Sequence, residues 1–108
     1  MDFGEAIKHL KAGRRVARSG WNGKGMWIAL TPGSIITLDK ARAGAAQMVA
    51  DDLMRNDHLN SHPRLQDRSM VIGAHIDMRA ADGSLVIGWL ASQTDMLAED
   101  WVCLDPVG

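Results

Sequence analysis

The feature that most constrains this chain is its division into short β-compatible runs, several of them separated by glycine or proline turns. The runs are residues 15–19, 26–30, 35–38, 72–78, 85–89 and 101–104. Pro32-Gly33 separates two of them, and Asp82-Gly83 is a strong signal for a tight hairpin turn between two others. Such short connections join antiparallel strands. The pattern therefore predicts a small antiparallel β-sheet.

Two segments have helical spacing instead. Near the N-terminus, apolar residues recur at the spacing of one helix face: Phe3, Ala6, Ile7 and Leu10. With Asp2 as a candidate N-cap and Gly13 as a stop signal, we predict a helix over residues 3–12. A second helix is expected over residues 39–57, capped by Asp39.

These elements together predict an α+β fold. A small antiparallel sheet would carry the N-terminal helix packed on it, with a helical insert in the middle of the chain at residues 39–69. The 108 residues are enough for a single domain spanning positions 1–108. From residue 56 to residue 69 the chain is polar, and we expect an irregular connection there.

Charge and hydropathy argue against a nucleic-acid-binding protein and against a membrane protein. Residues 1–38 hold six Lys and Arg against two acids, whereas residues 69–108 hold one Arg against six acids. A net charge of −1 without a long basic run argues against binding of long nucleic acid. No apolar stretch is long enough to span a bilayer, and no signal peptide is evident, so we expect a cytoplasmic protein without membrane association.

The stretch RSGWNGKGMW, residues 18–27, concentrates glycine, tryptophan and positive charge. Glycine lets the backbone approach a ligand closely, an indole offers a flat face to a base, and lysine suits phosphate. A nucleotide site would use all three. The alternative is a β-hairpin whose turn needs glycine and whose strands carry core tryptophans. For Trp21, which borders the turn, stacking on a ligand and a structural role both remain open.

Other chemistry has less support. His58 and His62 are four residues apart, and His75 and Asp77 share a strand face, but a closed zinc site usually needs four ligands. We therefore expect no metal site, and we interpret His75 and Asp77 as part of a polar, outward strand face. The serines lack the sequence signature of a nucleophile with a base and an orienting acid, so no catalytic residue is predicted.

Toward the C-terminus, Ser92 precedes Asp95 by three residues, the spacing of a capping box. We expect one short helical turn there, followed by a closing strand at residues 101–104. Trp101 in that strand, and Trp27 in the run at residues 26–30, are interpreted as packing residues.

Two blocks of the chain resemble a known phage family. DFGEAIKHLKAGRRVARSGWNGKGMWIAL at residues 2–30 and HIDMRAADGSLVIGWLASQTDMLAEDW at residues 75–101 are similar to the Thoeris anti-defence protein two family. WNGKGM and ASQTDMLAEDW are the specific motifs. The resemblance implies a sponge that holds cyclic ADP-ribose isomers made by Thoeris TIR-domain proteins, without cleaving them, in the host bacterial cytoplasm. It also implies that some members hold cyclic dinucleotides of the CBASS system, and that members assemble as homotetramers with ligand sites between subunits.

The resemblance also implies a ligand site on both motifs and no cofactor. The residues that match are Trp21, Asn22, Gly23, Lys24, Ser92, Gln93, Thr94 and Asp95, and we add Arg18 on chemical grounds. Trp21 would stack on the adenine, with Lys24 and Arg18 near the pyrophosphate. The amide and hydroxyl side chains would bind the riboses or the base edge. Asp95 has two possible roles, helix capping and ribose contact.

Two other functions remain open at this point. The chain could be a hydrolase that destroys such a signal, or an interaction module that acts directly on a defence effector, with Trp21 merely structural.

Overall fold

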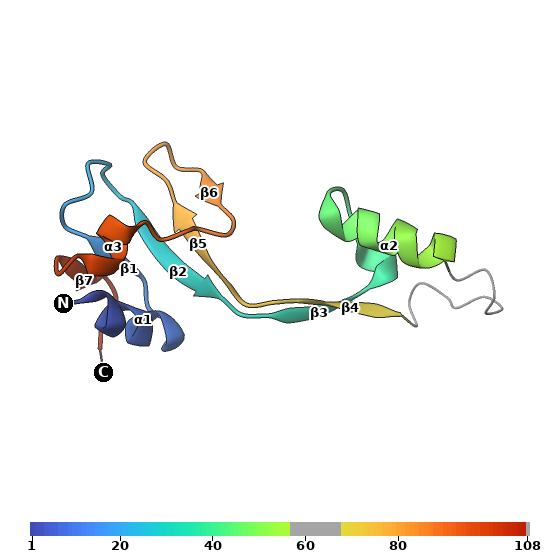
Figure 1. The fold of residues 1–108 in the computed structure, drawn as a ribbon, viewed down its shortest axis with the longest axis horizontal. Coiled ribbons are helices and arrows are strands. Elements are labelled where there is room, and N and C mark those ends of the chain that lie inside the picture. Colours follow the sequence, from blue (N-terminus) through green and yellow to red (C-terminus); the bar gives the residue numbers. More distant parts are fainter. Residues whose placement is uncertain (57–67, 108) are drawn as a thin grey trace. The chain divides into compact units, whose positions relative to one another are not determined.

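The computed structural model describes residues 1–56 and 68–107. The chain divides into two compact units, one made of residues 1–32 and 74–108 and the other of residues 33–73. Figure 1 labels the elements, which in chain order are α1 Phe3–Lys11, β1 Val16–Arg18, β2 Trp27–Thr31, β3 Ser34–Thr37, the 3-10 helix η1 Leu38–Lys40, α2 Ala45–Asn56, β4 Ser69–Ile72, β5 His75–Arg79, β6 Leu85–Val86, α3 Gln93–Leu97 and β7 Trp101–Cys103. The predicted α+β class with an antiparallel sheet is confirmed.

The first unit is built on a five-stranded sheet in the order β6-β5-β2-β1-β7, with every neighbouring pair antiparallel. Helix α1 contacts β1, β2 and β7. Between them lies a core of fully buried side chains: Ala6, Leu10, Val16, Ile28 and Trp101. The N-terminal helix thus packs on the sheet, as its apolar stripe predicts.

Helix α1 begins and ends where its sequence signals indicate. The Asp2 side chain accepts a hydrogen bond from the Glu5 main-chain nitrogen at 2.8 Å, which satisfies one unpaired donor of the first turn. Gly13, just beyond the helix, has a φ of 85°, a conformation that favours glycine.

The hairpin predicted at Asp82-Gly83 is confirmed. Gly83 has a φ of 90°, and the main chains of Ala80 and Ser84 pair at 2.8 Å, so β5 and β6 lie side by side. However, β6 ends at Val86, whereas the sequence pattern continues to residue 89. The strand stops early because Gly88 turns with a φ of 79° and donates its N–H to a side chain of β5.

The second unit pairs β3 with β4 in a two-stranded sheet and packs α2 over a small core of Leu38, Ala41 and Ala50. The predicted helix at residues 39–57 is shorter than expected. Asp39 lies inside η1 rather than capping a helix, and α2 starts only after Gly44, which has a φ of 79°. The left-handed turn at Gly44 therefore separates η1 from α2, although the apolar spacing of residues 39–57 predicted a single helix.

The prediction of one continuous strand over residues 72–78 is wrong. The structure has two strands there, interrupted at Gly73-Ala74: β4 pairs with β3, and β5 pairs with β2 and β6. Ser69, expected in an irregular connection, begins β4. Most of that expected connection, including His58 and His62, lies outside the described residues. Among the helices that the structure describes, none is long and apolar enough to cross a membrane.

Core packing gives a direct test of this architecture. Leu10 is 1% exposed, so Leu10→Ala should lower the free energy of unfolding by about 2 to 5 kcal/mol, through lost burial and the cavity that remains. Urea denaturation followed by circular dichroism measures the change. The neighbouring exposed residue provides the control, because Lys11→Ala should change stability by less than about 0.5 kcal/mol. Equal effects of the two variants would contradict the placement of α1.

Candidate ligand-binding site

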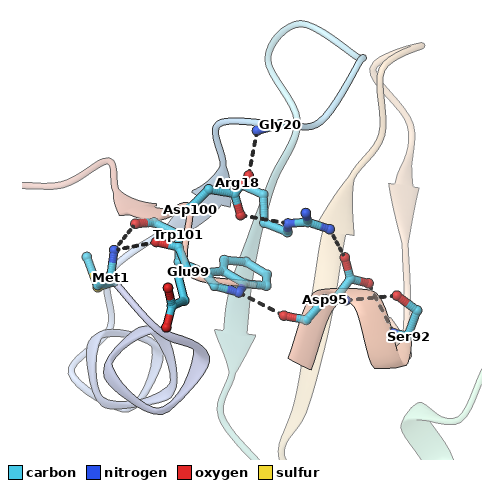
Figure 2. A network of polar contacts seen from close by, with 8 residues as sticks. All are labelled: Met1, Arg18, Gly20, Ser92, Asp95, Glu99, Asp100 and Trp101. Carbon is cyan, nitrogen blue, oxygen red and sulfur yellow. Dashed lines mark hydrogen bonds and ion pairs between the residues drawn. The ribbon is translucent and has the colours of Figure 1, made fainter. Parts of the chain in front are cut away.

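Arg18 joins the two sequence motifs. At the end of β1, its Nη1 lies 2.9 Å from Oδ1 of Asp95 in α3, and its Nε lies 2.9 Å from Oδ1 of Asp100 (Figure 2). The Arg18 side chain is 17% exposed. Two ion pairs at this degree of burial are screened less than surface pairs, and they fix the planar guanidinium in one orientation. The segment after β1 is thereby tied to the segment around α3.

Asp95 has a second role as a helix cap. Its Oδ2 accepts from the Ser92 main-chain nitrogen at 3.0 Å, and Ser92 Oγ accepts from the Asp95 main-chain nitrogen at 3.0 Å. This reciprocal capping box confirms the prediction from the Ser92 and Asp95 spacing. The main-chain oxygen of Asp95 also accepts from Trp101 Nε1 at 3.0 Å, which links α3 to the core.

The environment keeps both carboxylates ionised. Burial, the largest single influence on Asp95, opposes ionisation, but hydrogen bonds from Ser92, Arg18 and the Trp21 side chain outweigh it, and the pKa of Asp95 lies below its ordinary value. The Arg18 hydrogen bond is the main cause of the lowered pKa of Asp100, assisted by the Gly20 main chain. Arg18 therefore faces two anions at neutral pH.

Asp100 also holds the start of the glycine-rich turn. Its Oδ2 accepts from the Gly20 main-chain nitrogen at 2.8 Å. A Cβ on Gly20 would lie 2.7 Å from the same oxygen, so this approach requires glycine. The opposite end of the network meets the N-terminal segment, where the main chains of Met1 and Trp101 exchange two hydrogen bonds of 2.8 and 3.1 Å.

Three indole rings meet beside this network. The Trp21 centroid lies 6.4 Å from that of Trp89 and 5.4 Å from that of Trp101, and Trp89 lies 6.2 Å from Trp101. All three pairs are edge-to-face, the geometry that the ring quadrupole favours. Trp101 is fully buried, which confirms its predicted packing role, whereas Trp21 and Trp89 are half-buried. Trp21 thus packs on the core with one part and is open to solvent with another.

The rest of the turn is more exposed. Asn22 and Lys24 are exposed, and their side chains form no hydrogen bond or ion pair with another described residue. Gly23 is different, because a Cβ there would lie 2.3 Å from Met26 Sδ and 2.6 Å from Ala81 Cβ. Packing of the turn against the β5-β6 hairpin therefore requires a glycine at position 23.

The structure brings together only part of the predicted set. Arg18 pairs with Asp95, which in turn bonds with Ser92. Trp21 packs against Trp101, whose Nε1 donates to the Asp95 main-chain oxygen. Gln93 and Thr94 begin α3 with exposed side chains, and Asn22, Gly23 and Lys24 lie on the turn that Gly20 anchors. Two contributors were not predicted. Neither Asp100 nor Trp89 carries a local sequence signal that would place it at the site.

The interpretation of His75 and Asp77 as an outward polar face is wrong for Asp77. Asp77 is 4% exposed, the only charged residue among those described that is buried to this degree. It accepts hydrogen bonds from Thr31 Oγ1 and, at 2.9 Å, from the Gly88 main-chain nitrogen, and His75 Nε2 lies 3.3 Å from Oδ2. Burial, the largest influence, raises the pKa of Asp77, but these three partners together lower it below its ordinary value. Within the described parts of the chain, no three metal-ligating side chains cluster.

Comparison with known proteins identifies the family of this chain. The model of the Tad2-like family, described as a Thoeris anti-defense 2-like domain, matches residues 1–104. The chain belongs to that family. It is also similar to the Thoeris anti-defense 2 protein of Bacillus phage SP01, with 35% identity over 101 residues that cover 94% of this chain and 91% of the relative. The expected family is therefore confirmed, and its name is that of an anti-defence protein rather than of an enzyme.

The Arg18 ion pairs predict a specific pH dependence. Because the pKa values of Asp95 and Asp100 lie below the value of about 3.9 for an unfolded aspartate, these groups stabilise the fold above about pH 4. That contribution is lost as the pH falls through their folded-state pKa values. Arg18→Met should therefore be less stable than the wild type at pH 7, and the difference should narrow toward pH 3.

Denaturant titrations between pH 7 and pH 3 measure this difference. Arg55→Met is the matched control, because Arg55 pairs with Asp52 at 3.6 Å on an exposed surface and should contribute little at any pH. A stability difference for Arg18→Met that stays constant over this range would contradict the proposed coupling.

Proposed function

We propose that this protein binds and sequesters a cyclic ADP-ribose isomer, and so withholds the Thoeris signal from its effector. Membership of the Tad2-like family supports an anti-Thoeris role. The observation that carries the ligand assignment is the Arg18 bridge, which places the tryptophan-containing turn beside Ser92 and α3. One surface then combines an aromatic ring, amide and hydroxyl groups, and an exposed cation.

Each part of the ligand would have a counterpart in this site. The half-buried Trp21 ring would offer its solvent-exposed part to the adenine, and edge-to-face packing with two other indoles restricts its orientation. The exposed side chains of Asn22, Gln93 and Thr94 supply donors and acceptors for ribose hydroxyls or the base edge. A rigid platform of this kind loses little conformational entropy on binding, which favours high affinity.

The two cations of the motif would have different roles. Arg18 already faces Asp95 and Asp100, so its charge is offset and its proposed role is to position the turn. Lys24 is exposed and has no ion pair with a described residue, so we assign it to the pyrophosphate. Asp95, shown to be a cap, would contact the ligand only through atoms that the cap leaves free.

Asp95 and Asp100 are poorly suited to act as general acids. A general acid at neutral pH needs a raised pKa, whereas the pKa values of Asp95 and Asp100 are lowered and both groups pair with Arg18. The titration below distinguishes sequestration of an intact ligand from hydrolysis.

We also propose a homotetramer with ligand sites between subunits. Large apolar side chains in and after β6 and in α3 are strongly exposed, with Ile87 64%, Leu90 89% and Leu97 81% exposed. A small protein that exposes several large apolar side chains gains by burying them against another copy. The exposed side chains support self-association, and the number of four subunits follows from the family resemblance. Sedimentation should then give about four times the 11.8 kDa mass of one chain.

Calorimetric titration with a panel of cyclic ADP-ribose isomers, with cyclic dinucleotides as a second arm, tests the proposal. We expect saturable binding with a dissociation constant below about 1 μM, and recovery of the unchanged ligand by chromatography after heat denaturation of the complex. Conversion of excess ligand by trace protein would instead indicate a hydrolase. Absence of heat and of any thermal shift with every ligand would favour direct action on a defence effector.

Lys24 offers a variant that tests the site without disturbing the fold. Lys24→Gln should weaken binding about tenfold or more, because it removes a charge-assisted contact to phosphate, and should leave the melting temperature unchanged. Lys11→Gln is the matched control for loss of one exposed lysine and should bind like the wild type. Equal affinities of the two variants would remove Lys24 from the site.

A further inference from the structure

A buried carboxylate lies at the base of the segment that carries Trp89. Asp77 is in the middle of β5 and 4% exposed, and its two oxygens have different partners. Oδ2 accepts from the Thr31 hydroxyl of β2 and lies 3.3 Å from His75 Nε2, whereas Oδ1 accepts from the Gly88 main-chain nitrogen at 2.9 Å. Asp77 therefore ties the segment after β6 to the centre of the sheet.

This tie replaces the regular strand ladder. Met78 pairs with Val86, so continued pairing would place Ile87 opposite Asp77. Instead the chain turns at Gly88, with a φ of 79°, and the Gly88 N–H bonds to the Asp77 side chain. The next N–H, that of Trp89, donates to the Ile76 main-chain oxygen at 2.7 Å. Two successive hydrogen bonds thus set the direction in which the chain leaves the sheet.

The direction of this exit determines where Trp89 lies. Its ring packs edge-to-face against Trp21 at 6.4 Å and against the buried Trp101 at 6.2 Å. Trp101 is fixed by the core, so Trp89 is the neighbour of Trp21 whose position depends on the turn at Gly88. Three residues further on, Ser92 begins the capping box.

The buried charge of Asp77 is not explained by fold stability alone. Removing a carboxylate from water costs several kcal/mol unless donors compensate, and an apolar side chain would avoid that penalty. What an apolar side chain cannot do is capture the N–H of a glycine that has left the strand ladder.

We infer that Asp77 is a positioning residue of the ligand site, which holds the turn at Gly88 and thereby the Trp89 ring against Trp21. The inference rests on the proposed function, because its effect on a ligand presupposes that Trp21 binds one. It assigns no ligand contact to Asp77 itself.

The experiment compares Asp77→Ala with Asp77→Asn. An asparagine can still accept from the Gly88 N–H through its oxygen, and its amide can donate to the Thr31 hydroxyl, whereas alanine can do neither. Two measurements are made well below the melting temperature: near-UV circular dichroism of the indole cluster, and calorimetric affinity for the cyclic ADP-ribose isomer that binds the wild type most tightly.

For Asp77→Ala we expect an altered near-UV spectrum and affinity at least tenfold weaker, with the far-UV spectrum preserved. For Asp77→Asn we expect a near-wild-type spectrum and affinity within about threefold of the wild type. Asp82→Ala is the matched control, because Asp82 lies in the same hairpin and its side chain bonds, among the described residues, to Ser84 alone. It should bind like the wild type.

If Asp77→Ala fails to fold, Gly88→Ala disturbs the same turn from the other side. The space around Gly88 is open, but its positive φ disfavours alanine, so this variant should also change the indole spectrum and weaken binding. Wild-type affinity and spectrum in the folded Asp77→Ala or Gly88→Ala variant would overturn the inference, as would equal losses in Asp77→Ala and Asp77→Asn. No binding by the wild type would instead overturn the proposed function, and this assignment with it.

Discussion

The site depends on one guanidinium group held between two carboxylates. Arg18 ends β1, Asp95 forms the capping box of α3 with Ser92, and Asp100 holds the Gly20 main chain, so three segments of the first unit meet at a single side chain. Asp95 and Asp100, whose side chains are 14% and 31% exposed, would lose their shared partner without Arg18, and Asp100, which holds the Gly20 main chain, would be less firmly placed. Arg18 and Asp95 are 77 residues apart in sequence, and their ion pair joins the segments that carry the two motifs.

Charge in this unit is divided between structure and recognition. Arg18 and Asp77 are both partnered, and each fixes main chain that leads to an indole. Lys24 is left exposed on the turn, where a negatively charged ligand can reach it. A protein that captures a signal without altering it needs this combination of a rigid frame and a few free polar groups.

Elements with local signals were predictable from the sequence. The Asp2 cap, the Asp82-Gly83 turn and the Ser92 capping box each depend on residues a few positions apart, and the structure confirms all three. Long-range partners were not predictable. Asp100 is 82 residues from Arg18. The alternating pattern assigns Asp77 to one face of a strand, but it does not show that the chain after β6 bonds to Asp77. The break between β4 and β5 was missed because both halves are equally β-compatible.

The most direct test follows the indole N–H signals in a ¹H–¹⁵N NMR titration with a cyclic ADP-ribose isomer. Trp27 is the internal reference, because it alternates with the buried Ile28 along β2 and lies on the opposite face of the sheet. We expect the Trp21 signal to shift most and to saturate at the calorimetric stoichiometry, with the Trp27 signal little changed. Saturable binding that leaves the Trp21 signal in place would contradict the central claim that this ring receives the ligand.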